Sequence, residues 1–330
     1  MVSVLMLAYN VERFISASIQ SILGQSFTDF ELIIYNDGST DSTSSVITQY
    51  SDPRIKFYDQ AENRGLNYAR QATLTAARGK YIAILDSDDI SIADRLEKQY
   101  RFLEEHPTVA LCGGNALLMN EAGEASRELL HGLYKAAELK VRFFFNNIFV
   151  NSSVMYRREL ALQVGGYRER APAEDYDLFV RLSDEHDIHT FNEPLVYYRL
   201  HAENISQTKR AVAIAQLRQI KDEQLSLLGV DPQKYGPLFD ALLWWRLSEY
   251  SVADFWELLV TIKSANRISG KLPAVLFEKE LYSRWYELVI NSVPKRQAAK
   301  WLTKKGLFEP SLLNFKQKRR VLKLWLRSLF

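Results

Sequence analysis

The sequence predicts an α/β domain built on a largely parallel sheet, followed by an all-helical C-terminal region. Strand-like and helix-like segments alternate over roughly the first hundred residues. The strand segments are continuous apolar runs, as expected where helices cover both faces of a parallel sheet. Strand patterns then cease after about residue 210. We therefore predict one domain over residues 1–210 and a helical region over residues 211–330.

The first half alternates in a regular order. Strands are predicted, from apolar and β-branched runs, at Val2–Leu7, Phe30–Tyr35, Ile55–Tyr58 and Tyr81–Leu85. Helices are predicted, from apolar residues at helical spacing, at Glu12–Leu23, Ser42–Tyr50, Leu66–Ala77 and Ile92–Glu105. In a sheet of this kind ligands bind beyond the carboxyl ends of the strands, so the turns that follow the strands are the first candidates for a site.

The second half is mixed and then purely helical. Its predicted strands are Val109–Cys112, Val150–Arg157 and Leu195–Leu200, with helices between them at Lys135–Phe145 and Tyr176–Glu185. The helices predicted beyond residue 210 are Ala211–Leu228, Leu238–Leu247, Val252–Lys263, Leu276–Ile290 and Leu312–Leu329.

The composition is that of a globular protein, with 47% hydrophobic and 25% charged residues. The one cysteine, Cys112, lies at the end of an apolar strand and is expected to pack as a small core residue. A lone cysteine cannot form an internal disulfide, and neither a membrane-spanning segment nor a signal peptide is recognisable. We therefore expect a cytoplasmic protein.

Three polar clusters follow predicted strands: Ala8-Tyr9-Asn10, Asn36-Asp37-Gly38 and Asp86-Ser87-Asp88-Asp89. The three carboxylates of the last cluster repel one another, and Mg²⁺ or Mn²⁺ would offset them while also binding phosphate oxygens. A turn in which Asp89 or Ser91 caps the next helix explains the same cluster without a metal. Asp37 could likewise accept a hydrogen bond from a nucleotide base or ribose, or simply belong to a turn.

The sequence resembles the family-2 glycosyltransferases over about residues 1–205. The motifs that carry the resemblance occur in the order and spacing of that family. They are Ala8-Tyr9-Asn10, Asn36-Asp37-Gly38-Ser39-Thr40-Asp41, Asn63-Arg64-Gly65, Arg78 to Asp89, Val164-Gly165-Gly166-Tyr167 and Ala173-Glu174-Asp175-Tyr176-Asp177-Leu178.

The resemblance implies a GT-A-type, Rossmann-like fold that binds a nucleotide sugar, together with Mn²⁺ or Mg²⁺ and transfer with inversion. It assigns the base, usually uracil, to Asp37 and to a pocket lined by Ala8 and Tyr9. It assigns the remaining nucleotide-sugar contacts to Asn10, Arg70, Asp86 and Ser87, and a metal ligand to Asp88. Gln71 departs from the Ala-Arg-Asn that many members have in this helix, which leaves the details of the pocket there open.

The resemblance also assigns the general base to Asp175 and an orienting role to Glu174. An ordinary carboxylate with a pKa of about 4 can act this way if it accepts the proton as the new bond forms. Asp175 could instead serve only as the cap of the helix that follows. His201, after the last predicted strand, is either a metal or diphosphate contact or an exposed loop residue. Gly165, Gly166 and Tyr167 are assigned to the acceptor side.

Charge is unevenly distributed along the chain. Residues 1–210 hold 22 Lys and Arg against 29 Asp and Glu, whereas residues 211–330 hold 20 against 11. Near the C-terminus Lys316, Arg320, Lys323 and Arg327 share one helical face, and Leu322, Trp325, Leu326 and Leu329 share another. This helix either rests on an anionic membrane surface or docks on its own protein or another subunit. We expect no nucleic-acid partner, because the first 210 residues are acidic and no nucleic-acid motif occurs.

The sequence therefore favours transfer of a hexose or N-acetylhexosamine from a UDP-sugar to a saccharide or lipid-linked acceptor. Trp244, Trp245, Trp256 and Trp285 leave room for a homo-oligomer interface. A sugar-nucleotide pyrophosphorylase and a nicotinamide dehydrogenase are disfavoured, because no glycine-rich phosphate loop follows the first strand. A non-catalytic sugar-nucleotide binder or scaffold is the remaining alternative.

Overall fold

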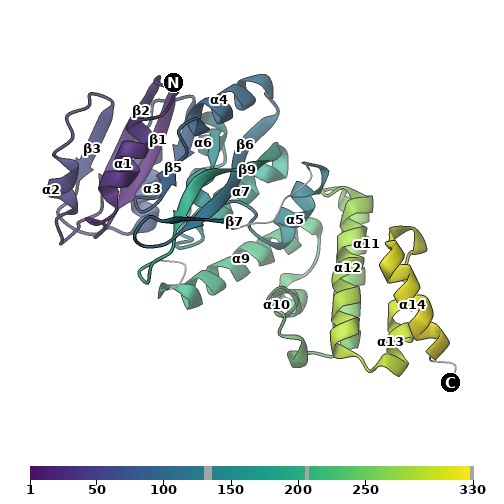
Figure 1. Cartoon of the computed structure of the whole chain (residues 1–330). Coiled ribbons are helices and arrows are strands. Elements are labelled where there is room, and N and C mark those ends of the chain that lie inside the picture. The colour runs from purple at the N-terminus through teal and green to yellow at the C-terminus, as the bar shows by residue number, and fades with distance from the viewer. Residues whose placement is uncertain (130–135, 205–207, 328–330) are drawn as a thin grey trace. The chain divides into compact units, whose positions relative to one another are not determined.

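The computed structural model describes residues 1–129, 136–204 and 208–327, which form two compact units (Figure 1). The first unit contains Met1–Leu139 and Asn146–Gln216. The second contains Lys140–Phe145 and the chain from Leu217 onward. The helix α9 (Arg210–Leu228) belongs to both, so the chain passes from one unit to the other inside a helix.

A parallel sheet forms the first part of the first unit. Its strands are β1 (Val2–Ala8), β2 (Phe30–Asn36), β3 (Ile55–Asp59) and β4 (Tyr81–Ile84). Strand β1 pairs in parallel with both β2 and β4, and β2 pairs with β3, as Figure 1 shows. The connecting helices are α1 (Ile15–Leu23), α2 (Thr43–Ile47) and α3 (Leu66–Ala76). Strands β1, β2 and β4 are buried almost throughout, which agrees with their continuous apolar sequences.

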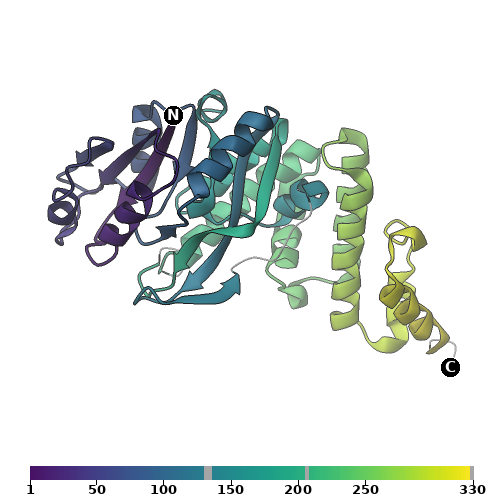
Figure 2. The ribbon, with the colours of Figure 1, turned by 45° about the horizontal axis from the view of Figure 1, so that its top comes forward.

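The sheet continues with strands of mixed direction, and its full order is β3-β2-β1-β4-β8-β6-β9-β5. Strand β7 pairs with β6 in addition. These strands are β5 (Ile90–Ser91), β6 (Val109–Met119), β7 (Ala125–Leu129), β8 (Met155–Arg157) and β9 (Asp187–Arg199). The helices between them are α4 (Arg95–Glu105), α6 (Arg158–Gln163) and α7 (Glu174–Glu185). Figure 2 shows α4 lying along β6.

Strands β6 and β9 are much longer than the predicted Val109–Cys112 and Leu195–Leu200. Gly113 and Gly114 interrupt the apolar pattern of β6, because glycine has a low strand propensity. The structure explains Gly114, since a Cβ there would lie 2.5 Å from Leu195 Cγ. The close approach of β9 therefore leaves no room for a side chain at position 114. Glycine is required there, and its low strand propensity is the reason why the full length of β6 was not predicted.

Cys112 lies inside β6 rather than at a strand end, and it is fully buried as expected. Burial raises the pKa of its thiol to about 12, which makes it unreactive near neutral pH.

Buried side chains of α4 donate hydrogen bonds to backbone carbonyls of the sheet and its adjoining turn. Arg95 Nη2 donates to the carbonyl of Ile84 at 2.8 Å, and Gln99 Nε2 donates to that of Ser153 at 2.8 Å.

The second unit is helical around an aromatic core. Its helices are α5 (Leu139–Phe145), whose first residue belongs to the first unit, the later part of α9, α10 (Pro232–Leu243), α11 (Val252–Ser269), α12 (Ala274–Ser292), α13 (Lys295–Leu302) and α14 (Phe315–Arg327). Phe145, Phe239, Phe277 and Trp285 are buried in its core, so Trp285 is not available for the predicted oligomer interface. Helix α11 has a capping box at Ser251 and Asp254 and ends at Gly270, where φ is +65°.

Several helical predictions differ from the structure. Helix α13 was not predicted, because its sequence begins with Lys295 and Arg296 and is short. Helix α14 begins at Phe315, three residues after the predicted start, and Leu329 lies outside the described residues. Over the described ranges, no helix is both long and apolar enough to cross a bilayer.

Candidate active site

The carboxyl ends of β1, β2 and β4 lie side by side and carry the three polar clusters. Ala8 at the end of β1 pairs with Asn36 at the end of β2, and the amide of Asp37 donates to the Ala8 carbonyl at 2.9 Å. Asn10, at a positive φ of 52°, accepts a hydrogen bond from the Thr40 amide at 2.8 Å. Its own amide donates to Ser39 Oγ at 2.9 Å. Asn10 therefore joins the turn after β1 to the turn after β2 through its backbone and its side chain.

The Asp37 carboxylate is buried and holds a neighbouring turn. Its two oxygens accept hydrogen bonds from the amides of Arg64 and Gly65, at 2.8 and 2.9 Å. Gly38 lies close to the same turn, because a Cβ there would lie 2.5 Å from the backbone nitrogen of Asn63. Asp37 thus has a clear structural role, and its oxygens keep lone pairs that can also accept from a ligand. Of the two residues assigned to the base pocket, Tyr9 is exposed and Ala8 is buried.

Asp86 is surrounded by hydrogen-bond donors. Arg70 Nη2 donates to Oδ1 at 3.0 Å, and Asn151 Nδ2 lies 3.0 Å from both carboxylate oxygens. Ser152 Oγ lies 3.1 Å from Oδ2. Asn151 and Ser152 were not predicted as site residues, because their sequence pattern indicates a strand over Val150–Arg157. They form a 3₁₀ turn over Asn151–Ser153 instead, and the Asn-Ser-Ser triplet was the signal, since these side chains bond to nearby backbone.

Asp89 is a buried structural residue. It accepts a hydrogen bond from the Arg199 amide at 2.9 Å and contacts Ser152 Oγ. Burial, together with Asp88 and Asp86, raises the pKa of Asp89 well above the usual carboxyl range. Helix α4 begins at Arg95 with Asp94 as its N-cap, so neither Asp89 nor Ser91 has the capping role considered from the sequence.

Asp88 and His201 come together from distant parts of the chain. Asp88 Oδ2 and His201 Nε2 are 2.8 Å apart, and the imidazole packs against Phe14 with ring centroids 4.8 Å apart. The backbone carbonyl of Asp88 accepts a hydrogen bond from Arg199 Nε at 2.8 Å, which fixes the turn. The His201 side chain is only 6% exposed, so it is not the exposed loop side chain considered from the sequence.

The Asp88–His201 pair fits the ligand requirement of a divalent ion that also binds phosphate. Asp88 Oδ2 and His201 Nε2 lie at hydrogen-bonding distance, 2.8 Å, and a carboxylate oxygen and an imidazole nitrogen are both groups that Mn²⁺ can bind. No group of three or more His, Cys, Asp or Glu side chains suited to a metal occurs among residues 1–129, 136–204 and 208–327. Ions of the Mg²⁺ type are commonly bound by one or two side chains together with substrate phosphates, and a pair of side chains is compatible with a site of that kind.

Arg70 links the strand-end carboxylates to the start of α7. It is buried in α3, and besides Asp86 it binds Glu174, with Nε 3.3 Å from Oε1. Glu174 is the first residue of α7 and is also buried. A buried carboxylate needs such a partner, because desolvation of an unpaired charge is costly. Arg70 therefore holds Glu174, and with it Asp175, at the end of the sheet that carries Asp86.

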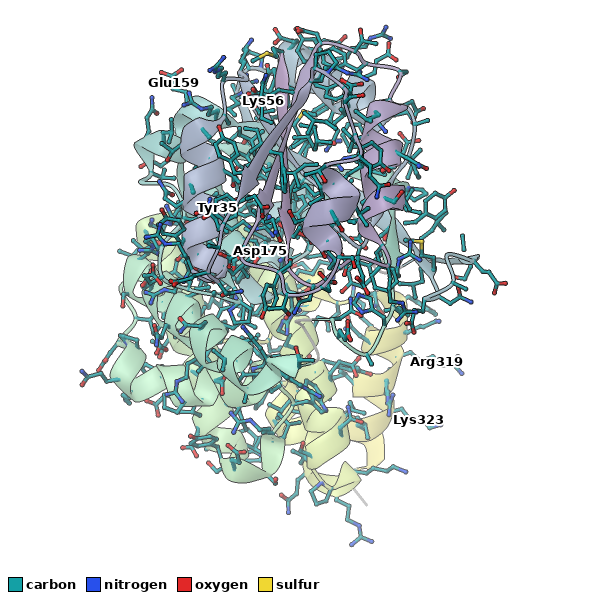
Figure 3. All side chains as sticks on the ribbon, turned by 90° about the vertical axis from the view of Figure 1, so that its left-hand side faces the viewer. Tyr35, Lys56, Glu159, Asp175, Arg319 and Lys323 are labelled. Carbon is teal, nitrogen blue, oxygen red and sulfur yellow. The ribbon has the colours of Figure 1, made fainter. Side chains whose placement is uncertain are left out.

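Asp175 differs from the ordinary carboxylate assumed from the sequence. It is partly buried, and its Oδ1 accepts a hydrogen bond from the Tyr176 amide at 2.6 Å. Burial, and then the nearby charge of Glu174, raise the pKa of Asp175 to about 7. Figure 3 shows Asp175 toward the end of the sheet where Tyr35 lies, whereas Lys56, near the start of β3, lies toward the opposite end.

The loop assigned to the acceptor side is held by α3. Gly165 and Gly166 have positive φ of 88° and 67°, and the Tyr167 amide donates to Gln71 Oε1 at 2.9 Å. The Tyr167 ring is buried, and its hydroxyl lies 3.1 Å from that of Tyr156. Gln71 is the residue at which this sequence departs from the Ala-Arg-Asn of many family members. It therefore contacts the acceptor-side loop through the Tyr167 amide.

Comparisons with known proteins identify the family to which the chain belongs. Residues 3–165 match the model of a family described as Glycosyl transferase family 2. The O-antigen biosynthesis glycosyltransferase WbnJ of Escherichia coli is 34% identical over 219 residues, covering 64% of this chain and 84% of that protein. The UDP-Glc:alpha-D-GlcNAc-diphosphoundecaprenol beta-1,3-glucosyltransferase WfgD of Escherichia coli is 38% identical over 122 residues, covering 37% of this chain and 48% of that protein.

A solved structure supports the fold. A mannosyltransferase from Pyrobaculum calidifontis, in complex with GDP-Man and Mn²⁺, superposes with a TM-score of 0.56 at 18% identity. The match covers 100% of this chain and 87% of that one, and it shows a shared GT-A-type fold. With the family model and the similarity to WbnJ, it follows that this chain is a glycosyltransferase belonging to glycosyl transferase family 2.

Proposed function

We propose that the chain transfers a hexose or N-acetylhexosamine, with inversion, from a UDP-sugar to a hydroxyl of a growing surface polysaccharide or a lipid-linked saccharide. The link from Asp86 through Arg70 to Glu174 carries this proposal, because it keeps a candidate base at the strand ends where nucleotide sugars bind in folds of this class. The names of WbnJ and WfgD, one acting in O-antigen synthesis and one on a lipid diphosphate acceptor, support the acceptor class.

In this proposal Asp175 accepts the proton of the acceptor hydroxyl while that oxygen bonds to the anomeric carbon. Its pKa of about 7 suits the role, since a base is most effective when its pKa lies near the working pH. Glu174, paired with Arg70, orients Asp175 and the acceptor loop around Gly165, Gly166 and Tyr167. Residues 1–210 then form the catalytic domain and residues 211–330 a helical region.

The donor would lie across the three strand ends. Ala8, Tyr9 and Asp37 would contact the base, and Asn10, Arg70, Asp86 and Ser87 would complete the nucleotide-sugar contacts. Asp88 and His201 would hold Mn²⁺ or Mg²⁺, which when bound neutralises negative charge on the diphosphate leaving group. The Mn²⁺ in the mannosyltransferase complex supports a metal of this kind.

UDP release from UDP-sugars in the presence of Mn²⁺, with water as the acceptor, tests the proposal directly. UDP-glucose, UDP-galactose and UDP-N-acetylglucosamine serve as donors. Asp88→Ala and Asp175→Asn should each lower the rate, by roughly 10² to 10⁴-fold for the base. Asp29→Asn is the matched control, because Asp29 is an exposed carboxylate that pairs with the N-terminal amine. Donor binding without turnover would favour a non-catalytic binder, and unchanged rates in both site variants would refute the mechanism.

A further inference from the structure

Tyr35 lies near the carboxyl end of β2, two residues before Asp37. Its ring is on the side of the sheet that α3 covers, because the ring centroids of Tyr35 and Tyr68 of that helix are 6.5 Å apart. Asp37 faces the same side, since it binds the amide of Gly65, the N-cap residue of α3. Figure 3 shows Tyr35 toward the end of the sheet where Asp175 lies. Tyr35 therefore belongs to the donor side of the site.

The Tyr35 hydroxyl is buried and has no hydrogen-bond partner within residues 1–129, 136–204 and 208–327. The residue as a whole is 4% exposed. The polar groups closest to it in the fold are engaged elsewhere. The hydroxyl of Tyr68 accepts from Arg64 Nη1 at 2.5 Å, and the Asp37 oxygens accept the two backbone amides described above. A buried hydroxyl without a partner is costly, so it needs an explanation, and a ligand that accepts its proton is one.

The Asp37 carboxylate is near enough to act on this hydroxyl. Burial raises the pKa of Tyr35, and the charge of Asp37 raises it further, whereas Arg64 lowers it. A hydroxyl of this kind keeps its proton and can donate it to a hydrogen bond, while the ionised carboxylate can only accept. The end of β2 thus presents an acceptor and a donor on the same side of the sheet.

An acceptor beside a donor matches one edge of particular nucleotide bases. Uracil, thymine and guanine each have a ring N–H next to a carbonyl oxygen. Cytosine and adenine have a ring nitrogen without hydrogen next to an amino group, which reverses donor and acceptor. A hydroxyl can rotate to accept from the amino group, but a carboxylate cannot donate to the ring nitrogen.

We propose that the Tyr35 hydroxyl donates a hydrogen bond to a carbonyl of the donor base, beside the ring N–H that Asp37 accepts. Tyr35 and Asp37 together then determine which bases the site accepts, with uracil among those that fit. This inference rests on the proposed function, because it needs a nucleotide at the strand ends. It adds to the base contacts of Ala8, Tyr9 and Asp37 a hydroxyl that selects for a carbonyl.

A bound water is the other partner that would satisfy the hydroxyl. Water would do so in the free protein, and the affinity for a base would then be independent of the hydroxyl. Tyr35→Phe removes the hydroxyl without changing the shape of the ring, so it separates the two explanations. The thermal stability of the free protein should not fall in this variant, because the hydroxyl that is lost has no protein partner.

Calorimetric titration of the full-length protein with Mn²⁺ and three nucleotides tests the proposal. The nucleotides are UDP, 2-thio-UDP and 4-thio-UDP, in which sulfur, a weak acceptor, replaces one carbonyl oxygen at a time. We expect the wild type to bind UDP about tenfold more tightly than one of the two thio analogues, as for the loss of one buried hydrogen bond. Tyr35→Phe should weaken UDP binding by a similar factor and bind that analogue and UDP equally well.

Tyr100→Phe is the matched control. Tyr100 is a half-buried residue of α4 in the same unit, and its ring packs against Tyr81, the first residue of β4, at the opposite end of the sheet. This variant should bind all three nucleotides as the wild type does.

Three results would overturn the inference. They are UDP binding by Tyr35→Phe that equals that of the wild type, wild-type binding of both thio analogues that equals that of UDP, and an equal loss in Tyr35→Phe for all three nucleotides. A wild type that binds no UDP would refute the proposed donor as well. UDP release by the wild type, together with unchanged UDP affinity in Tyr35→Phe, would refute this inference alone.

Discussion

Glu174 and Asp175 are adjacent at the start of α7, but their carboxylates have different surroundings. Glu174 is buried against the Arg70 guanidinium, which offsets its charge. No ion pair in the described structure involves Asp175, and it lies next to the Glu174 charge in a partly buried position. Neighbouring carboxylates of this kind titrate as a pair, and the less compensated one keeps its proton to a higher pH. The two residues are thereby suited to different tasks, one positioning and one proton transfer.

Asp175→Asn should lower the rate of transfer by roughly 10² to 10⁴-fold and yet stabilise the protein above neutral pH. The wild-type carboxyl has its pKa raised from 3.8 to about 7, so the stability of the folded state falls as the pH rises from about 4, where the unfolded chain ionises, to about 7, where the folded state ionises. Asparagine keeps the acceptor for the Tyr176 amide without the charge. At pH 8 we expect a gain on the order of 1–2 kcal/mol, discounted for partial exposure, and at pH 5, about one unit above the unfolded-state pKa, less than half of that gain.

Thermal unfolding of both proteins at the two pH values measures this difference. Activity of the wild type should rise with pH through about 7 and then level off, as expected for a base with that pKa. Equal melting temperatures at pH 8, or a rate that does not change between pH 5 and 8, would contradict the assignment of Asp175 as the base.

At the scale of elements, α3 connects the donor side of the site to the acceptor loop. In this helix Arg70 binds Asp86 and Glu174. The next residue, Gln71, accepts a hydrogen bond from the Tyr167 amide. Asn67, one turn earlier, accepts a hydrogen bond from the Ala171 amide at 3.0 Å. Helix α3 therefore contacts both the donor side of the site and the acceptor loop.

Gln71→Ala should loosen the acceptor loop while the donor site is retained. The Tyr167 amide would lose its acceptor, at a cost of about 1–3 kcal/mol for a buried unpaired group. Gly166 would also lose its neighbour, since a Cβ at Gly166 would lie 2.4 Å from Gln71 Oε1. Hydrogen exchange of Tyr167 should accelerate in Gln71→Ala but not in the control Thr75→Ala, an exposed residue of α3. A protected Tyr167 amide in both variants would show that the loop is held by other contacts.

The sequence predicts the parallel part of the fold better than the contacts of the site. Continuous apolar runs specify β1, β2 and β4, and parallel pairing then places Ala8 beside Asn36 without further information. The link from Arg70 to Glu174 spans 104 positions, and no local pattern encodes it. The turn at Asn151–Ser153 was hidden for a different reason, because Val150 and Val154 on either side of it favour a strand by propensity.

At the scale of the whole molecule, the site and the basic helices belong to different units. The strand ends and α7 lie in the first unit, and α13 and α14 lie in the second. Of the 40 Asp and Glu residues, 29 lie in residues 1–210. The cores of the two units are separate sets of residues, so a ligand of one unit need not change the packing of the other. This division predicts that donor binding changes hydrogen exchange in the first unit and not in the second.

Addition of a UDP-sugar with Mn²⁺ should slow hydrogen exchange in the first unit alone. We expect protection at residues 8–10, 36–41 and 86–89, and none in α11, α12, α13 or α14. A donor at a hundred times its Kd stabilises the state that binds it by about 2.7 kcal/mol, enough for a clear change in exchange and in melting temperature. Asp88→Ala should show neither effect, since it removes a proposed ligand of the metal between the phosphates. Protection that appears in the second unit while the strand ends exchange as before would mean that the nucleotide sugar binds elsewhere.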